Sequence, residues 1–288
     1  MQPFAYTAPT TVKEAVEILT KHGNKARPLA GGTDLLVQIR GGRFNLDAVV
    51  DIKKIPELNN LSNDSNSLNI GAAVPCHRIY EDPKISEDFP GLIDAAELIG
   101  GIQIQSRAGF GGNLCNSTPS GDSICPLIVL STVANIEGSK GKRSIPVEDF
   151  CTGPGSNTLE DGEILVSLSI PNQGSKFNSA YERFIPRNEM DIAVAGVASS
   201  ILIGSNGKIE SARIALASVG PTPIFAKKAS ESLIGKEPGE AAFKEAGAIA
   251  KTECSPIEDM RGTVDQRKHL VDVLTVRTLN KSLERIGG

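Results

Sequence analysis

Three long segments of alternating apolar and polar residues, followed only by helical patterns, constrain the fold of the second half of the chain most. The alternating segments span roughly residues 178–184, 193–203 and 208–219. Such alternation is typical of half-buried strands, and Gly204-Ser205-Asn206-Gly207 predicts a tight turn between the last two, so we expect an antiparallel meander. The helical patterns cover 223–234, 239–251 and 264–286. Strands followed by helices indicate an α+β domain.

The first half of the chain has shorter elements. Residues 11–22 predict an amphipathic helix in which Thr11 and Glu14 form a capping box. A strand over 26–30 then leads through glycines into a helix over 35–40, which ends at Gly41. Further strands are expected over 47–52, 67–72, 133–138, 143–147 and 163–170, and helices over 91–99 and from 124 onward. This pattern predicts a first domain over 1–175 and a second domain over 176–288.

Composition excludes several classes of protein. The chain has 288 residues, of which 40% are hydrophobic and 22% charged, so it contains enough apolar material for a packed core and is not a disordered chain. Its formal net charge is −4, aromatic residues make up 4%, and it has no Trp. A basic face and aromatic stacking residues are what nucleic-acid binding requires, so we expect no nucleic-acid partner.

Membrane insertion and a metal site are not expected from this sequence. The longest nearly apolar run, 124–136, is interrupted by polar residues and is shorter than the roughly 18 to 20 residues that span a bilayer. The first residues do not resemble a secretory signal, which predicts a cytoplasmic location. Five Cys without a CxxC spacing are typical of a reduced compartment and predict no iron–sulfur cluster or zinc site in this chain.

Two glycine-rich segments are the candidate functional elements. Gly31-Gly32-Thr33-Asp34 lies between a predicted strand and a predicted helix, where free backbone N–H groups can hold a phosphate. Its spacing matches neither the dinucleotide fingerprint nor the P-loop, and a tight turn without a ligand is an equal alternative. The second segment, Gly109 to Asn113, is followed by Asn116 and Asp122. Asp122 either accepts hydrogen bonds from ribose hydroxyls or caps the next helix, and both alternatives stay open.

Several fragments, taken together and in order, resemble one family. They are Leu29-Ala30-Gly31-Gly32-Thr33-Asp34-Leu35-Leu36, Ala108-Gly109-Phe110-Gly111-Gly112-Asn113, Thr118-Pro119-Ser120-Gly121-Asp122, Glu163-Ile164-Leu165, and Tyr181-Glu182-Arg183 leading to Asp191-Ile192-Ala193. The chain resembles, over nearly its whole length, the FAD-binding medium subunit of the molybdenum hydroxylases, the xanthine and carbon monoxide dehydrogenase family. Its opening residues 4–9 also look like that family's first strand.

The resemblance implies a fold and a set of cofactor-binding residues. The fold is a PCMH-type FAD-binding domain of two α/β subdomains, about 1–55 and 56–175, followed by a domain with a three-stranded antiparallel sheet and a helical bundle. The implied FAD-binding residues are Leu29, Ala30, Gly31, Gly32, Thr33, Asp34, Leu35, Leu36, Gly109, Phe110, Gly111, Gly112, Asn113, Asn116, Asp122, Leu165 and Arg183. Arg183 stands where the family usually has Lys. Thr33 stands where relatives with covalent flavin have His, so the FAD is expected to be non-covalent.

The resemblance also implies a function without a catalytic acid or base in this chain. FAD would take electrons from [2Fe–2S] clusters of a small partner subunit and pass them to an external acceptor, while a large partner subunit holds the molybdenum cofactor. The expected assembly is (αβγ)2. Two other classes stay open: a stand-alone FAD-dependent reductase of the same fold, which would need a proton-donating residue beside the flavin, and a nucleotide-binding scaffold, which would show no flavin absorption.

Overall fold

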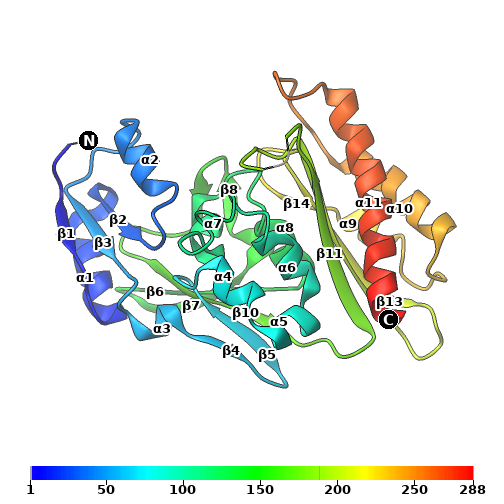
Figure 1. Cartoon of the computed structure of the whole chain (residues 1–288), viewed down its shortest axis with the longest axis horizontal. Coiled ribbons are helices and arrows are strands. Elements are labelled where there is room, and N and C mark those ends of the chain that lie inside the picture. Colours follow the sequence, from blue (N-terminus) through cyan, green and yellow to red (C-terminus); the bar gives the residue numbers. More distant parts are fainter. Residues whose placement is uncertain (1, 188, 288) are drawn as a thin grey trace.

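The computed structural model describes residues 2–187 and 189–287, which form three consecutive lobes around a three-, a five- and a four-stranded sheet. Figure 1 shows the N-terminal lobe at the left, the five-stranded sheet in the lower centre, and the C-terminal sheet with its long helices at the right. No helix in the described ranges is long and apolar enough to cross a membrane.

The N-terminal lobe is a small parallel sheet covered by one long helix. Its strands are β1 (Ala5–Thr7), β2 (Ala26–Leu29) and β3 (Ala48–Asp51), in the order β1-β3-β2. Helix α1 (Val12–His22) buries the apolar face predicted for it, and the Thr11 hydroxyl accepts the Glu14 N–H at 3.2 Å. The Glu14 carboxylate accepts the N–H of Thr10, one residue before the predicted partner, at 2.9 Å. Helix α2 (Leu35–Arg40) follows the first glycine segment.

The middle lobe contains an antiparallel sheet in the order β4-β5-β10-β6-β7. The strands are β4 (Leu61–Asn63), β5 (Ser67–Gly71), β6 (Val133–Gly138), β7 (Gly141–Pro146) and β10 (Ile164–Pro171). The short hairpin of β8 (Cys151–Gly153) and β9 (Ser156–Asn157) lies outside this sheet. The helices are α3 (Pro56–Asn59), α4 (Cys76–Tyr80), α5 (Pro83–Asp88), α6 (Pro90–Ala96), α7 (Phe110–Asn116) and α8 (Ile124–Val129).

The C-terminal lobe confirms the meander and corrects one detail. Strands β11 (Phe177–Phe184), β12 (Ala195–Ile203) and β13 (Ile209–Ala217) pair antiparallel, as predicted. A fourth strand, β14 (Ile224–Phe225), pairs with β13 inside the segment predicted to be wholly helical. The prediction failed there because two apolar residues after a proline fit a sheet edge as well as a helix. Helices α9 (Lys227–Glu231), α10 (Glu240–Glu253) and α11 (Val264–Gly287) complete the lobe, and the side chains of one face of this sheet form a separate apolar core with them.

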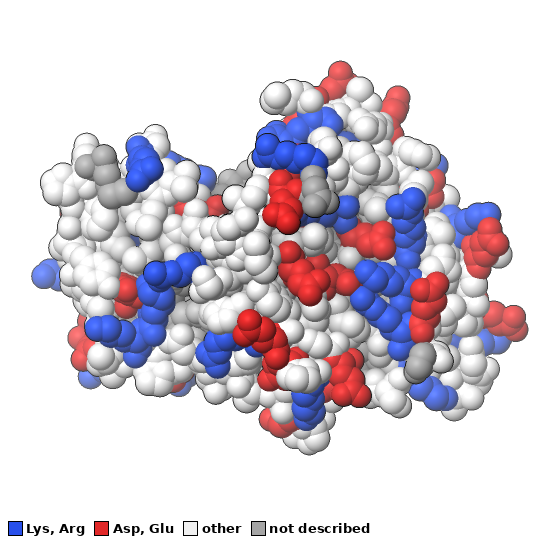
Figure 2. Space-filling view, viewed as in Figure 1, with Lys and Arg blue, Asp and Glu red and all other residues white. Residues whose placement is uncertain are grey.

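An ion cluster joins the C-terminal helix to the middle lobe. Asp94 on α6 accepts two hydrogen bonds of 2.8 Å from Arg285 and one of 3.0 Å from Lys281, both on α11. It also accepts the Tyr181 N–H of β11 at 3.0 Å. Burial raises the pKa of Asp94, but the hydrogen bonds and positive charges outweigh it and lower the pKa below its usual value. On the molecular face drawn in Figure 2, acidic and basic side chains lie next to one another.

Replacing Asp94 by Asn is expected to lower the free energy of unfolding by about 2 to 3 kcal/mol at neutral pH, because charge-assisted bonds to a mostly buried carboxylate are lost. The pKa of Asp94 is lower in the folded state, so its stabilisation exists above the unfolded pKa of about 4 and disappears as the pH falls through the folded value. Urea unfolding against pH measures both effects. Glu284→Gln, at an exposed position on α11, is the control and should change stability by less than about 0.5 kcal/mol.

Candidate cofactor-binding site

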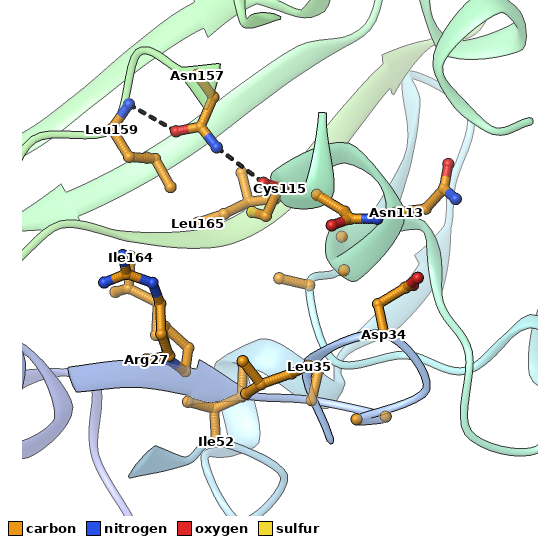
Figure 3. A pocket seen from close by; sticks show the side chains of 18 of the residues that line it. Arg27, Asp34, Leu35, Ile52, Asn113, Cys115, Asn157, Leu159, Ile164 and Leu165 are labelled. Atoms are coloured by element: carbon orange, nitrogen blue, oxygen red, sulfur yellow. Dashed lines mark hydrogen bonds between the residues drawn. The ribbon is translucent and has the colours of Figure 1, made fainter. Parts of the chain in front are cut away.

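A pocket of about 470 Å³ lies between the N-terminal and middle lobes. Both glycine-rich segments line it, together with β2 and residues 155–165 that lead into β10. Figure 3 shows side chains from these elements surrounding one opening. Segments that are far apart in the sequence therefore share one cleft, as a cofactor that uses both glycine segments requires.

The first glycine segment places bare backbone on the wall of the pocket. An added Cβ at Gly31 would lie 1.9 Å from the carbonyl oxygen of Arg107, so only glycine lets the two loops approach this closely. Gly32 has a φ of 77°, a left-handed conformation that favours glycine. In the described part of the chain, the N–H groups of Gly31, Gly32 and Thr33 find no hydrogen-bond acceptor. Three free donors thus lie on a segment that lines the pocket.

The second glycine segment is a helix start rather than the loop that the sequence suggested. Helix α7 begins at Phe110, and Gly109 is its N-cap. Added Cβ atoms at Gly109 and Gly111 would lie 2.3 Å from the carbonyl oxygens of Val74 and Ala72, because this backbone packs directly on residues 72–75. A Cβ at Gly112 would meet no atom within 4 Å, although Gly112 lines the pocket. Two of these glycines thus serve packing, and Gly112 keeps space open.

The other end of the pocket is an apolar slot. Figure 3 shows Arg27 and Ile52 from the N-terminal lobe facing Leu159, Ile164 and Leu165 from the middle lobe. Burial lowers the pKa of Arg27, and its guanidinium lies 5.0 Å from the centre of the Phe44 ring. A slot with apolar walls and an arginine face suits a flat aromatic ring.

Sequence reasoning missed two residues that shape this slot. Asn157 donates to the carbonyl of Cys115 at 2.8 Å and accepts the N–H of Leu159 at 3.1 Å, so it fixes one wall. Nothing in its local sequence indicates this role. Arg27 did carry a signal, because it is a basic residue in the strand directly before the first glycine segment.

Most of the sequence-predicted binding residues line the pocket. Those that do are Ala30, Gly31, Gly32, Thr33, Asp34, Leu35, Gly109, Gly111, Gly112, Asn113, Asn116 and Leu165. Asn116 also accepts a hydrogen bond of 2.9 Å from Gln38 of α2, which ties the two lobes together beside the pocket. Burial raises the pKa of Asp34.

The remaining predicted residues do not line the pocket. Phe110 is completely buried in the core, Leu29 packs in a small apolar cluster of the N-terminal lobe, and Leu36 is 42% exposed. Asp122 and Arg183 form an ion pair at 2.6 Å, with side chains that are 9% and 5% exposed. Their direct contact with the cofactor stays a prediction.

Asp122 connects the middle lobe to β11. Its two carboxylate oxygens accept the Tyr181 hydroxyl at 2.8 Å and Arg183 at 2.6 Å. Burial raises the pKa of Asp122 to about 6, although Arg183 and the Tyr181 hydrogen bond act in the opposite direction. Helix α8 is capped at Ser123 without a side-chain hydrogen bond, so the alternative that Asp122 caps this helix is wrong.

Comparison with known proteins agrees with the geometry. The family described as the FAD binding domain in molybdopterin dehydrogenase matches residues 2–173, and the CO dehydrogenase flavoprotein C-terminal domain matches residues 179–282. The chain is 30% identical to a putative xanthine dehydrogenase FAD-binding subunit of Escherichia coli (strain K12), over 99% of this chain and 97% of the relative. It is also 30% identical to the carbon monoxide dehydrogenase medium chain of Hydrogenophaga pseudoflava, over 98% of each chain.

Solved structures give the same result. A carbon monoxide dehydrogenase from Hydrogenophaga pseudoflava that lacks the Mo-pyranopterin moiety contains a chain with a TM-score of 0.93 and 32% identity, and 99% of each chain is covered. A quinoline 2-oxidoreductase from Pseudomonas putida 86 matches with a TM-score of 0.90 and 27% identity over 98% of each chain. These matches confirm the family resemblance seen in the sequence, and the chain belongs to the molybdenum hydroxylase family as an FAD-binding medium subunit.

Proposed function

We propose that this chain binds one FAD non-covalently in the pocket between its first two lobes and acts as the electron-transfer subunit of a molybdenum hydroxylase complex. A small partner subunit with [2Fe–2S] clusters supplies the electrons, a large partner subunit holds the molybdenum cofactor, and an external acceptor takes the electrons from the flavin. The assembly is (αβγ)2. Relatives described as medium chains of dehydrogenases support a complex of this kind.

The single observation that carries the proposal is the convergence of both glycine segments on one pocket. The diphosphate of FAD needs close backbone N–H donors, and Gly31, Gly32 and Thr33 offer donors without acceptors in the described chain. The apolar slot lined by Ile52, Leu159 and Ile164 suits an aromatic ring of the cofactor. Donors for two phosphates and a slot for a ring are the features that a dinucleotide requires.

In this proposal, the residues of this chain bind the cofactor and shield it from water, and they transfer no protons. When bound, FAD supplies the ability to take up electrons singly and to release them in pairs. Gly112 leaves room for the cofactor, and the free N–H groups of the first glycine segment donate to it. Ile164 and Leu165 line the slot with apolar side chains, which would keep water away from a bound ring. We assign no catalytic acid or base, because the proposed reaction at this site is electron transfer.

The purified chain is expected to bind about one FAD, to show flavin absorption, and to release all of the flavin on acid precipitation. Release is expected because Thr33, and not His, stands in the first glycine segment. Flavin in the protein pellet would contradict non-covalent binding, and a colourless chain after incubation with FAD would contradict the proposal itself.

A reduction experiment separates electron transfer from the stand-alone reductase. The FAD-loaded chain is mixed anaerobically with the reduced small subunit from the same host. The loss of flavin absorption is then followed by stopped flow. Rapid bleaching that requires the small subunit supports the proposal. Bleaching by an organic substrate with the chain alone would favour the reductase, and no bleaching in either case would contradict electron transfer through this flavin.

A further inference from the structure

Lys53 contacts the residue just before the first glycine segment, and its side chain is not among those that line the pocket. It lies two residues after the end of β3, at the edge of the parallel sheet where β2 also runs into Ala30 and the glycines. Its ammonium group donates to the carbonyl of Ala30 at 3.1 Å and to the Asp51 carboxylate at 2.7 Å. Lys53 thus holds the residue just before the glycine segment without being part of the pocket wall.

A short chain of contacts holds Lys53 itself in place. Asp51 is 7% exposed and accepts the Lys53 backbone N–H at 3.0 Å. The Tyr6 hydroxyl of β1 donates to the second oxygen of Asp51 at 2.6 Å. The preceding carbonyl, that of Leu29, is also held, by the N–H of Ile52 at 3.1 Å. All three strands of the small sheet therefore contribute to fixing the backbone at Leu29 and Ala30.

Peptide geometry carries this constraint to the pocket. In a planar trans peptide the C=O and N–H groups point in opposite directions, and the chain has no cis peptide bond among the described residues. The C=O of Ala30 and the N–H of Gly31 belong to the same peptide. Because Lys53 holds this C=O, the N–H of Gly31 points away from Lys53, and Gly31 itself lines the pocket whereas Lys53 does not.

We propose that Lys53, held by Asp51 and Tyr6, is a positioning residue that fixes the Ala30–Gly31 peptide so that the Gly31 N–H donates to the diphosphate of the bound cofactor. This inference rests on the proposed FAD site. Lys53 acts through geometry and not as a cation for the phosphates, because its charge is paired with Asp51 and it is not part of the pocket wall.

The test compares Lys53→Met with Lys54→Met in the full chain, with FAD as the titrant. Lys54→Met is the matched control, because Lys54 is exposed and its replacement removes the same charge one residue away. Lys53→Met is expected to raise the Kd for FAD about 10-fold, as for one charge-assisted hydrogen bond. It is also expected to lower the melting temperature of the apoprotein, because Asp51 loses its cation, so the Kd is measured at a temperature at which the variant is folded. Lys54→Met should leave the Kd within about twofold, and Lys53→Arg should recover most of the affinity.

Two further measurements keep the outcome decisive. Tyr6→Phe removes only the hydroxyl that holds Asp51, at a residue that is 59% exposed, and is expected to raise the Kd about threefold even if Lys53→Met fails to fold. The amide NMR signal of Gly31 should shift when FAD binds to the unmodified chain and shift less in the Lys53 variant.

Each result has one meaning. Equal Kd values for Lys53→Met and the unmodified chain, equal losses in Lys53→Met and Lys54→Met, or no effect of Tyr6→Phe would overturn the positioning role. If the unmodified chain does not bind FAD, the proposed function fails, independently of the role of Lys53.

Discussion

Replacing Gly112 by valine is expected to weaken FAD binding at least about 100-fold while the apoprotein folds normally. A Cβ at this position meets no protein atom within 4 Å, and Gly112 lines the pocket beside the other glycines. The added side chain would therefore occupy space that only the cofactor needs. Loss of close backbone approach together with a steric clash accounts for an effect of this size.

Gly111→Ala gives the contrasting result and serves as the comparison. Its Cβ would lie 2.3 Å from the carbonyl oxygen of Ala72, so the apoprotein itself should lose stability. Gly112→Ala should instead raise the free energy of unfolding of the apoprotein by about 0.5 to 1 kcal/mol, because it removes a glycine from a helix. FAD titration and thermal unfolding measure the two effects separately. Normal FAD affinity in Gly112→Val would contradict the placement of the cofactor beside α7.

The regular elements of the fold were largely predictable because their signals are local. Val12, Ala15, Val16 and Leu19 recur with helical spacing, and the structure buries all four. The alternation in the three long segments after residue 176 likewise becomes β11, β12 and β13. Short elements such as α3 and β4 escaped prediction, because four or three residues contain too little periodicity to identify.

The glycine segments were predictable as a site but not in their structural detail. A sequence shows that Gly109, Gly111 and Gly112 are close together, but not that two of them pack against Ala72 and Val74. Those partners come from another part of the chain and are adjacent only after folding. The same holds for Lys53, whose role depends on the position of the Ala30 carbonyl across the small sheet.

Asp122 shows why partners distant in sequence decide a side chain's role. Locally, an Asp before a helix predicts an N-cap, and that alternative was wrong because Arg183 and Tyr181, about sixty residues away, take both carboxylate oxygens. The pair also gives a structural role to Arg183, at a position where the family resemblance led us to expect Lys. Both residue types can supply a cation to Asp122, and the single contact from Arg183 to Asp122 is one that a lysine could also make.

Replacing Arg183 by leucine is expected to lower the free energy of unfolding of the apoprotein by about 3 to 5 kcal/mol at about pH 8, because it leaves Asp122 buried without its cation. The folded-state pKa of Asp122, about 6, lies above its unfolded value, so the folded state binds more protons between the two values. Stability therefore falls as the pH rises through this window. Without Arg183 the folded-state pKa of Asp122 rises further, and the pH range over which stability falls extends upward. The stability difference between the variant and the unmodified chain should therefore grow from about pH 5 to about pH 8.

Urea unfolding of Arg183→Leu, Asp122→Asn and the double variant tests this pairing. The double variant should lose less than the sum of the single losses, because removing both charges leaves no unpaired carboxylate in the core. Arg183→Lys keeps a cation beside the buried carboxylate and should therefore lose only about 1 kcal/mol relative to the unmodified chain. Two results would show that the ion pair does not stabilise the contact between the middle lobe and β11. One is additive losses in the double variant, and the other is a loss of stability in Arg183→Leu that does not change with pH.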